Sequence, residues 1–349
     1  MLSKNTRNEF IKPKVAVLVL NYNGKIHLKE CFESLKEQTY ENYEVYLVDN
    51  ASSDDSIEYT KRLFPWVKII AFNRNWGFAE GYNRAIKLMK TNLIALLNND
   101  TKVDKKWLEE LVKAIVKDNK IIAVGSKILL YEDPRIINHA GAKITPIGGG
   151  FDIGFLRCDK GKGESYRSKY VGAVCGAAML VRRDLFLKIG GFDKHFFAYF
   201  EDTDFCWRAW LLGYKVLFVP SSIVYHKLGG SWGRKSPIKV YLGQKNRIIS
   251  LIKNFNLLLL LRGLFLNIVY TSLKLLEFML SRDTLSTISL LKAYFYVIRN
   301  IRDIIKKRII IQSKRRINDT FLIKYGLIAS LDECIKVYYT THSIRRIFS

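Results

Sequence analysis

Three amide and carboxylate side chains, Asn98, Asn99 and Asp100, follow directly after the apolar run from Ile94 to Leu97. Such a run is typical of a strand that is covered on both faces of a sheet. In open α/β sheets ligands bind just beyond the carboxyl ends of these strands. A carboxylate there suits a hard divalent cation that also contacts substrate phosphates. The same residues are also favoured in a turn that ends in a helix cap, so this stretch alone supports either interpretation.

Polar residues occupy the corresponding place after three other predicted strands. Amphipathic helices separate the strands, so they form βαβ units with parallel strands. Since parallel strands end at the same edge of a sheet, the polar groups should gather there, which favours a ligand site over unrelated turns. The strands are Val15 to Leu20, Glu44 to Val48 and Val67 to Ala71, and the polar groups after them are Asn21 to Gly24, Asp49-Asn50 and Arg74 to Gly77.

Two of these residues suggest contacts to a nucleotide. The Asp49 carboxylate could accept hydrogen bonds from the imide of a base or from a ribose, and the Arg74 guanidinium could balance a diphosphate. The alternatives are a helix cap at Asp49 and a solvated surface charge at Arg74.

The densest carboxylate cluster of the chain is Glu201-Asp202-Thr203-Asp204, which begins a predicted helix that runs to Leu212. Carboxylates at a helix N-terminus are stabilised by the helix dipole, so capping is one interpretation. The aromatic residues before the cluster, from Phe196 to Phe200, would desolvate one carboxylate. Desolvation raises the pKa of a carboxyl group and suits it to general base catalysis.

His226 follows a predicted strand that ends at Tyr225 and precedes the polar segment from Lys227 to Ser231. A neutral imidazole in this place could bind the same cation as Asp100. A structural hydrogen bond is the alternative role for this single histidine.

Seven motifs in their order along the chain resemble glycosyltransferase family 2, and in particular its rhamnosyltransferase-like members. The resemblance covers Lys14 to Phe255. The motifs are VLNYNG (Val19 to Gly24), VDNASSDDS (Val48 to Ser56), NRNWGFAEGYNRA (Asn73 to Ala85), LLNNDT (Leu96 to Thr101), GAAMLVRRDLFLKIGGFD (Gly176 to Asp193), YFEDTDFCWRAWLLGY (Tyr199 to Tyr214) and VYHKLGGSWG (Val224 to Gly233).

The resemblance implies a glycosyltransferase A type fold, with a single Rossmann-like domain that binds a nucleotide-diphospho-sugar on a mostly parallel central sheet. It also implies Mn²⁺ or Mg²⁺ as cofactor and inversion at the anomeric carbon. Asp49 matches the carboxylate that contacts the base, and Asp100 the aspartate that bridges cation and diphosphate. Asp202 matches the catalytic base, and His226 a histidine that completes the metal site in some relatives.

Further residues of the same motifs complete the expected site. The first carboxylate of the family's Asp-X-Asp motif is replaced by Asn98, whose amide oxygen could still orient the sugar or a metal-bound water. On the donor side we expect Asn21, Asn23, Asn50, Arg74, Gly77 and Asn98, and on the acceptor side Glu201 and Trp232.

One motif of the family's polymer synthases is not evident. Gln244-Lys245-Asn246-Arg247 lacks the tryptophan of the processive signature Gln-X-X-Arg-Trp. This difference favours an enzyme that adds a single sugar.

The 349 residues suffice for a large α/β domain with an appendage. We expect an N-terminal extension at 1–13, the glycosyltransferase domain at 14–255 and a basic, apolar helical region at 256–349. From Tyr131 to Lys169 the chain is rich in glycine and lacks periodicity, so we expect a long functional loop or a pair of weak strands. Five cysteines without paired spacing and a polar N-terminus without an apolar core indicate a cytoplasmic location.

The formal net charge is +25, and the excess lies mainly near the C-terminus. From Arg234 to Ser349 there are 22 basic and 6 acidic residues, a net charge of +16, so anionic lipids or phosphates are expected partners. Leu257 to Leu280 is long enough to span a bilayer. Because Arg262, Lys274 and Glu277 interrupt it, an in-plane membrane helix and a buried or dimerising helix are alternatives to a span.

These features predict an inverting glycosyltransferase that moves a hexosyl or rhamnosyl group from a nucleotide-diphospho-sugar to a hydroxyl of a glycan or lipid-linked acceptor. Its expected place is cell-surface polysaccharide or glycolipid assembly, peripherally at the inner face of the membrane. An inactive, donor-binding scaffold is an alternative because of Asn98. A nucleic-acid-binding protein fits less well, since the basic residues accompany Ile and Leu and form no recognition motif. The sequence does not define an oligomeric state.

Overall fold

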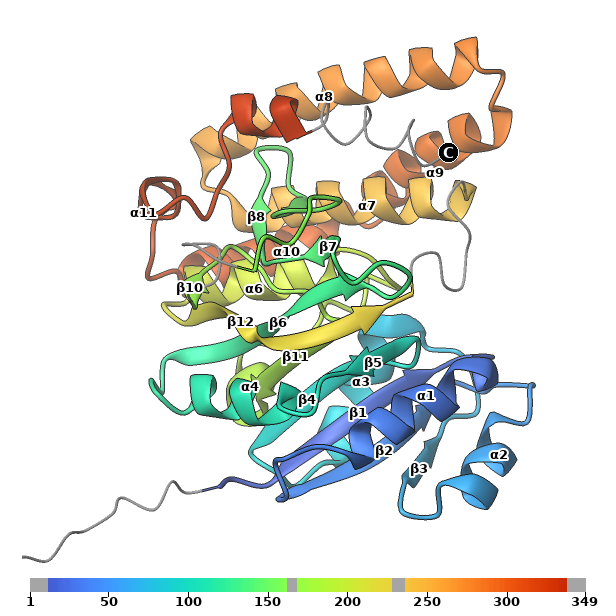
Figure 1. Cartoon of the computed structure of the whole chain (residues 1–349). Helices are drawn as coiled ribbons and strands as arrows, with labels where there is room; N and C mark the ends of the chain where they lie inside the picture. The colour runs from blue at the N-terminus through green and yellow to red at the C-terminus, as the bar shows by residue number, and fades with distance from the viewer. Residues whose placement is uncertain (1–11, 162–167, 228–235, 338–349) are drawn as a thin grey trace, which may run out of the picture.

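The computed structural model describes residues 12–161, 168–227 and 236–337. A mixed sheet of ten strands lies at its centre, in the order β10-β12-β6-β11-β4-β1-β2-β3, with β5 added to β12 and β7 to β6 (Figure 1). The N-terminal half supplies the parallel strands β1 (Val15–Asn21), β2 (Tyr43–Asp49), β3 (Lys68–Ala71) and β4 (Leu93–Asn98). These are the four strands that the sequence predicts, and their parallel pairing confirms the βαβ prediction.

The strands at the middle of the sheet are buried on both faces. In β4, Ile94 and Leu96 pack into one apolar layer, while Ala95 and Leu97 pack into the layer on the opposite face. All four side chains are fully buried, as the continuous apolar run predicts. Four helices connect and cover the strands of the N-terminal half: α1 (Lys25–Lys36), α2 (Ser56–Leu63), α3 (Gly77–Leu88) and α4 (Trp107–Ile115).

The second half of the sheet is mixed. β11 (Ala178–Arg182) runs antiparallel to both β4 and β6 (Ile121–Leu130), and β12 (Lys215–His226) runs parallel to β6. The short β5 (Thr101–Val103) pairs antiparallel with the end of β12. The helices α5 (Arg183–Lys188) and α6 (Glu201–Leu211) lie between β11 and β12 in the chain.

Two details differ from the sequence prediction. We predict that Pro220 ends the strand that begins at Lys215, but β12 continues to His226. Its pairing with β6 shifts register between Val219 and Ile223, and this irregularity accommodates the missing N–H of proline. The described part of the glycine-rich segment contains the short strands β7 (Ile137–His139), β8 (Ala142–Ile144) and β9 (Gly150–Asp152), and β10 (Lys169–Tyr170) begins at its end.

The C-terminal helices stack on one side of the sheet, with α8 farthest from it (Figure 1). They are α7 (Pro237–Asn254), α8 (Leu257–Leu280), α9 (Thr284–Arg299), α10 (Ile301–Ser313) and α11 (Asp319–Lys324). A buried charge cluster joins α7 to α6, because Lys253 Nζ lies 2.5 Å from Asp193 Oδ2 and 2.9 Å from Asp204 Oδ1. Within the described residues, α8 is the one helix long and apolar enough to cross a membrane by length and composition.

Candidate active site

The carboxyl ends of three parallel strands bring their polar residues side by side. In the register of the sheet Asn21 of β1 pairs with Asp49 of β2, and Leu20 pairs with Asn98 of β4. The polar groups therefore share one edge of the sheet, as the sequence predicts from parallel pairing.

A hydrogen-bond network joins these strand ends. Asn21 Nδ2 donates to Asp49 Oδ1 at 3.1 Å, and Asn21 Oδ1 accepts from Asn99 Nδ2 at 2.6 Å. The second carboxylate oxygen of Asp49 accepts from the backbone N–H of Ser52 at 2.9 Å. Asn21 and Asp49 are almost fully buried. The network fixes the orientation of the Asp49 carboxylate, and its oxygens retain lone pairs for further hydrogen bonds.

Three of the expected donor-side residues hold loops together at this edge. Asn23 Oδ1 accepts from the backbone N–H of Ser53 at 2.7 Å, which ties the loop after β1 to the loop after β2. Asn50 is buried and donates to the backbone oxygen of Gly77 at 2.9 Å. Gly77 has a φ of +73°, and a Cβ there would lie 2.6 Å from the backbone oxygen of Phe197. The turn before α3 therefore requires glycine.

Arg74 lies exposed on the same turn, where its guanidinium stacks on Trp76. The guanidinium carbon is 3.5 Å from the ring centre, and that of Arg84 is 3.4 Å from it. This stacking orders the Arg74 side chain and keeps its positive charge accessible.

Asp100 and His226 come together because β5 pairs with the end of β12. Thr101 pairs with His226, and His226 Nε2 lies 3.2 Å from Asp100 Oδ1. On its other side the ring of His226 contacts Asn138, with Nδ1 and Oδ1 3.1 Å apart. Burial opposes ionisation of Asp100, but the imidazoles of His226 and His27 outweigh it and lower the pKa of this carboxyl group. Asp100 is therefore held as a carboxylate.

His27, in the first turn of α1, is a member of this site that the sequence did not single out. Burial lowers the pKa of its imidazole, while the charge of Asp100 acts in the opposite direction. In the described part of the chain, the buried atoms His27 Nδ1 and Asp100 Oδ1 have no hydrogen-bond partner.

These residues fit a divalent cation that the protein only partly encloses. The buried Asp100 Oδ1 lies 3.2 Å from His226 Nε2, so a carboxylate oxygen and an imidazole nitrogen stand side by side as ligands. Across residues 12–161, 168–227 and 236–337, no group of three His, Cys, Asp or Glu side chains is arranged to hold a metal ion. Diphosphate oxygens and water would therefore complete the coordination shell, which is common for Mg²⁺ and related cations.

The carboxylate cluster at the start of α6 divides into three environments. Asp204 is fully buried and paired with Arg208 at 2.8 Å and with Lys253, so it is structural. Glu201 is also buried, and its Oε2 has no hydrogen-bond partner among the described residues. Asp202 accepts from the N–H of Gly176 at 2.8 Å and from that of Thr203 at 2.6 Å.

Burial raises the pKa of both Glu201 and Asp202. For Glu201 the effect is large, and the charge of Asp202 adds to it. For Asp202 the two backbone N–H groups partly offset the effect of burial. The direction agrees with the expectation that the aromatic flank desolvates a carboxylate.

The segment before β11 links Asp202 to the carboxyl end of β4. The N–H of Asn98 donates to the oxygen of Ala177 at 2.9 Å, and the neighbouring Gly176 donates to Asp202. Only a short peptide segment therefore separates the end of β4 from the carboxylate at the start of α6.

A histidine and aspartate pair supports this segment. His139 Nδ1 lies 2.7 Å from Asp152 Oδ1, and His139 Nε2 accepts from the N–H of Cys175 at 3.1 Å. This arrangement defines the neutral tautomer that carries its proton on Nδ1. The pair fixes the backbone just before Gly176, and no pattern in the sequence predicts it.

One expected acceptor-side residue, Trp232, lies outside the described residues. The structure places the other expected side chains in two groups. Asn21, Asn23, Asp49, Asn50, Arg74, Gly77, Asn98, Asp100 and His226 lie along the strand edge, and Glu201 and Asp202 lie at the start of α6.

Comparison with known proteins defines the class of this fold and site. Residues 16–190 match the family described as "Glycosyl transferase family 2". The fold is the glycosyltransferase A type. It is similar to "Crystal structure of GalNAc-T7 with UDP, GalNAc and Mn2+", with a TM-score of 0.56 and 21% identity over 69% of this chain and 48% of that one. A second similar structure is "Mannosyltransferase PcManGT from Pyrobaculum calidifontis in complex with GDP-Man and Mn2+", with a TM-score of 0.51 and 18% identity over 69% of this chain and 64% of that one.

The chain belongs to glycosyltransferase family 2. It is 27% identical over 240 residues to the N-acetylglucosaminyl-diphospho-decaprenol L-rhamnosyltransferase of Mycobacterium tuberculosis, covering 62% of this chain and 77% of that protein. It is 26% identical over 204 residues to the low-salt glycan biosynthesis hexosyltransferase Agl10 of Haloferax volcanii, covering 56% of this chain and 61% of that protein. The protein is therefore a glycosyltransferase, as the sequence motifs predict.

Proposed function

We propose that this protein is an inverting glycosyltransferase that transfers a single hexosyl or rhamnosyl group from a nucleotide-diphospho-sugar to a hydroxyl of a lipid-linked or glycan acceptor. The observation that carries this proposal is the pair of carboxylate environments at one sheet edge. Asp100 is held ionised beside imidazoles, whereas burial raises the pKa of Asp202. The first suits cation and diphosphate binding, and the second suits proton transfer.

The donor lies across the carboxyl ends of β1, β2 and β4 in this proposal. Asp49 accepts hydrogen bonds from the base or ribose, since Asn21 and Ser52 fix its orientation. Arg74, ordered by Trp76, balances the diphosphate charge. Asn98 orients the sugar in place of the carboxylate that relatives carry.

Asp100 and His226 would hold Mn²⁺ or Mg²⁺, and both similar structures are complexes with Mn²⁺. When bound, such a cation neutralises the charge that develops on the leaving diphosphate. The site does not select between the two metals, because a carboxylate, an imidazole and phosphate oxygens are acceptable to either.

Asp202 acts as the general base. Its carboxylate takes the proton of the acceptor hydroxyl while that oxygen attacks the anomeric carbon from the side opposite the diphosphate. This geometry inverts the anomeric configuration. The N–H groups of Gly176 and Thr203 hold the carboxylate in place by hydrogen bonds, and these neutral groups place no full positive charge beside it. Glu201, just before it, lies on the acceptor side.

The proposed setting is the assembly of a cell-surface polysaccharide or glycolipid, with the enzyme bound peripherally to the cytoplasmic face of the membrane. The diphospho-decaprenol in the name of the Mycobacterium tuberculosis relative supports a lipid-linked acceptor. The basic C-terminal third supports contact with anionic lipid.

A donor panel tests this function. The full chain is heated with each of several nucleotide sugars, with and without Mn²⁺, and a donor at 100 times its Kd should add about 2.7 kcal/mol of stability. The donor that raises the unfolding temperature is then offered to short lipid-diphosphate sugars, and the anomeric configuration of the product is read by NMR. Retention of configuration would contradict the inverting mechanism. A donor-specific shift without transfer or hydrolysis would instead support a donor-binding scaffold.

A further inference from the structure

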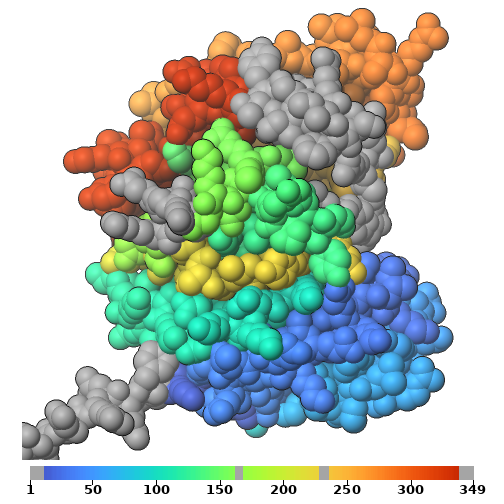
Figure 2. All heavy atoms as spheres, in the orientation of Figure 1, coloured from blue at the N-terminus to red at the C-terminus, as the bar shows by residue number. Residues whose placement is uncertain are grey.

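The outer face of α8 is an apolar surface that the other described residues leave uncovered. Two of its side chains, Phe265 and Met279, are 65% and 68% exposed. The helix forms the top of the molecule, away from the sheet, as the ribbon and space-filling views show (Figures 1 and 2). We define the outer face of α8 by six exposed residues that lie on one side of the helix: Leu258, Leu261, Phe265, Leu276, Met279 and Leu280.

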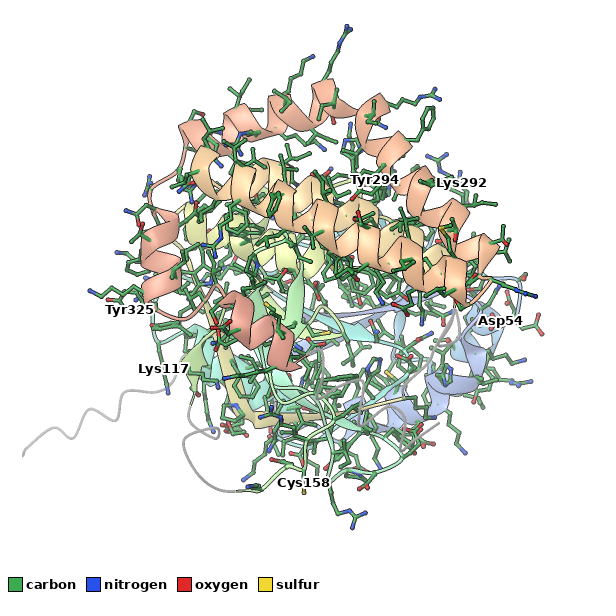
Figure 3. All side chains as sticks on the ribbon, turned by 90° about the horizontal axis from the view of Figure 1, so that it is seen from above. Asp54, Lys117, Cys158, Lys292, Tyr294 and Tyr325 are labelled. Atoms are coloured by element: carbon green, nitrogen blue, oxygen red, sulfur yellow. The ribbon has the colours of Figure 1, made fainter. Side chains whose placement is uncertain are left out.

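The opposite face of α8 is attached to the protein through polar side chains. Gly263, Asn267 and Thr271 lie one turn apart and are buried. Asn267 Oδ1 accepts from Gln244 Nε2 of α7 at 3.1 Å and from the hydroxyl of Tyr294 of α9 at 2.8 Å. Gln244 also donates to Thr271 at 3.0 Å. Figure 3 shows α8 from above with Tyr294 on the neighbouring α9.

This attachment determines how α8 can meet a membrane. A spanning helix would have to leave α7 and α9 and expose Asn267 and Thr271 to hydrocarbon, where polar groups without partners are strongly unfavourable. While α8 stays attached to α7 and α9, its outer face can enter a membrane only if the helix axis lies parallel to the membrane surface. Lys274 is half-buried and paired with Glu277 at 2.7 Å, so Arg262, near the start of the helix, is the charged residue of α8 that lies beside the apolar side chains of the outer face.

The charges around the outer face indicate what covers it. Arg262 lies near its start, Arg282 follows its end, and Lys292 lies exposed on α9, where Figure 3 labels it. A second copy of the chain would bring these cations against their own counterparts. Anionic lipid headgroups complement them, and each Lys or Arg near such a surface adds to the attraction.

Contacts of α7 link α8 to the segment that begins α6. On α7 the guanidinium carbon of Arg247 stands 4.4 Å from the ring centre of Tyr270 of α8. A Cβ at Gly149 would lie 3.6 Å from Arg247 Cγ and 3.3 Å from the ring of Phe200, the residue before Glu201. Gly149 therefore lies near both Arg247, which contacts α8, and Phe200, which precedes α6.

We propose that the outer face of α8 lies in the plane of an anionic bilayer surface, with its apolar residues among the acyl chains and the flanking cations on the headgroups. The helix then does not span the membrane. This inference deepens the peripheral location under Proposed function and rests on it. It gives the membrane a defined position relative to Asp202.

Vesicle flotation of the full chain tests the proposal without any sugar donor, so its failure is distinct from failure of sugar transfer. The probes are vesicles that contain phosphatidylglycerol and vesicles of phosphatidylcholine alone. We expect binding to the anionic vesicles that weakens as salt is added. The double variant Phe265→Glu with Met279→Glu should bind them more than about tenfold more weakly, because two exposed apolar contacts are replaced by negative charges.

The matched control is Leu88→Glu at the end of α3, which also replaces an exposed helical apolar residue, here 60% exposed. It should bind as the unmodified protein does. All three proteins should unfold at the same temperature, because the changed side chains are exposed. Equal vesicle binding by the double variant and the control would overturn the proposal.

Two further outcomes would also overturn it. Alkaline carbonate should release the bound protein, and retention in the vesicles would mean that α8 spans the bilayer. Light scattering should give the same mass for the unmodified protein and the double variant. A dimer that only the double variant dissociates would assign the outer face to a second copy of the chain.

Discussion

Asp100 at the strand edge and Asp202 at the start of α6 are both buried carboxyl groups, but their surroundings shift the pKa in opposite directions. Imidazoles beside Asp100 lower its pKa against the effect of burial. Asp202 accepts hydrogen bonds from two backbone N–H groups, none of its hydrogen-bond partners among the described residues is a cationic side chain, and burial raises its pKa. The comparison teaches that neighbouring sites can hold a cation and a proton acceptor at the same time, because imidazoles outweigh burial at Asp100 whereas burial outweighs the weaker effects of the backbone N–H groups and His139 at Asp202.

The largest effect should come from Asp202→Asn. An amide cannot take the acceptor proton, so kcat should fall by about 10²–10⁴ while the protein keeps its unfolding temperature. Initial rates of sugar transfer measure this change. Asp55→Asn is the matched control, because that side chain is 76% exposed on the same domain and should retain full activity. Normal turnover of Asp202→Asn would remove this residue from the role of base.

His226→Ala should act on the other carboxylate. Without the imidazole nitrogen beside Asp100, the Mn²⁺ concentration for half-maximal donor binding should rise about 10–100-fold. Titration of Mn²⁺ at fixed donor measures it. His226→Asp, which restores an oxygen ligand, should recover part of the affinity. An unchanged metal requirement in His226→Ala would mean that the histidine serves only the contact to Asn138.

The pH dependence of kcat/KM distinguishes the role of Asp202 from that of Asp100 without any substitution. A base must be ionised to act, so activity should fall as pH decreases through the raised pKa of Asp202, about tenfold per pH unit. This acid limb should lie above the ordinary aspartate pKa of about 3.9. Rates from pH 4 to 8, measured at saturating metal, locate it. A limb at the ordinary value would contradict the desolvated base.

Glu201→Gln should have the smallest effect and should concern stability. Because burial raises the folded-state pKa of Glu201, its ionisation destabilises the fold as pH rises from the unfolded-state pKa to the folded-state pKa. The variant removes this penalty, so it should be more stable at neutral pH by about 1–3 kcal/mol and equally stable at low pH. Urea unfolding at both pH values measures the difference. A less stable variant at neutral pH would indicate that the carboxylate has a partner.

The strand edge could be predicted from the sequence because its signals are local. Apolar runs define β1, β2 and β4, and parallel pairing then places Asn21, Asp49 and Asn98 together without further information. The structural roles of Asn50 and Gly77 were harder to predict from the sequence. Whether an asparagine faces a ligand or a backbone oxygen depends on a loop from another part of the chain.

The supporting residues could not be predicted, because their partners are distant in sequence and lack periodicity. His139 and Asp152 lie in the glycine-rich segment, where short strands give no apolar pattern, and their contact to Cys175 exists only after folding. In the sequence His27 occupies an ordinary polar position of an amphipathic helix. Only the pairing of β5 with β12 in the folded protein places Asp100 near it. The effect of Pro220 could not be predicted for the same reason. Whether the strand continues past this proline depends on the irregular pairing of β12 with β6.

Donor affinity of two variants tests the division between the two carboxylates most directly. Calorimetry with Mn²⁺ and the donor from the panel should give Asp202→Asn the affinity of the unmodified protein, and Asp100→Asn an affinity at least about tenfold lower. Both variants should be inactive in transfer. The division would be contradicted if Asp202→Asn lost donor affinity while Asp100→Asn kept it.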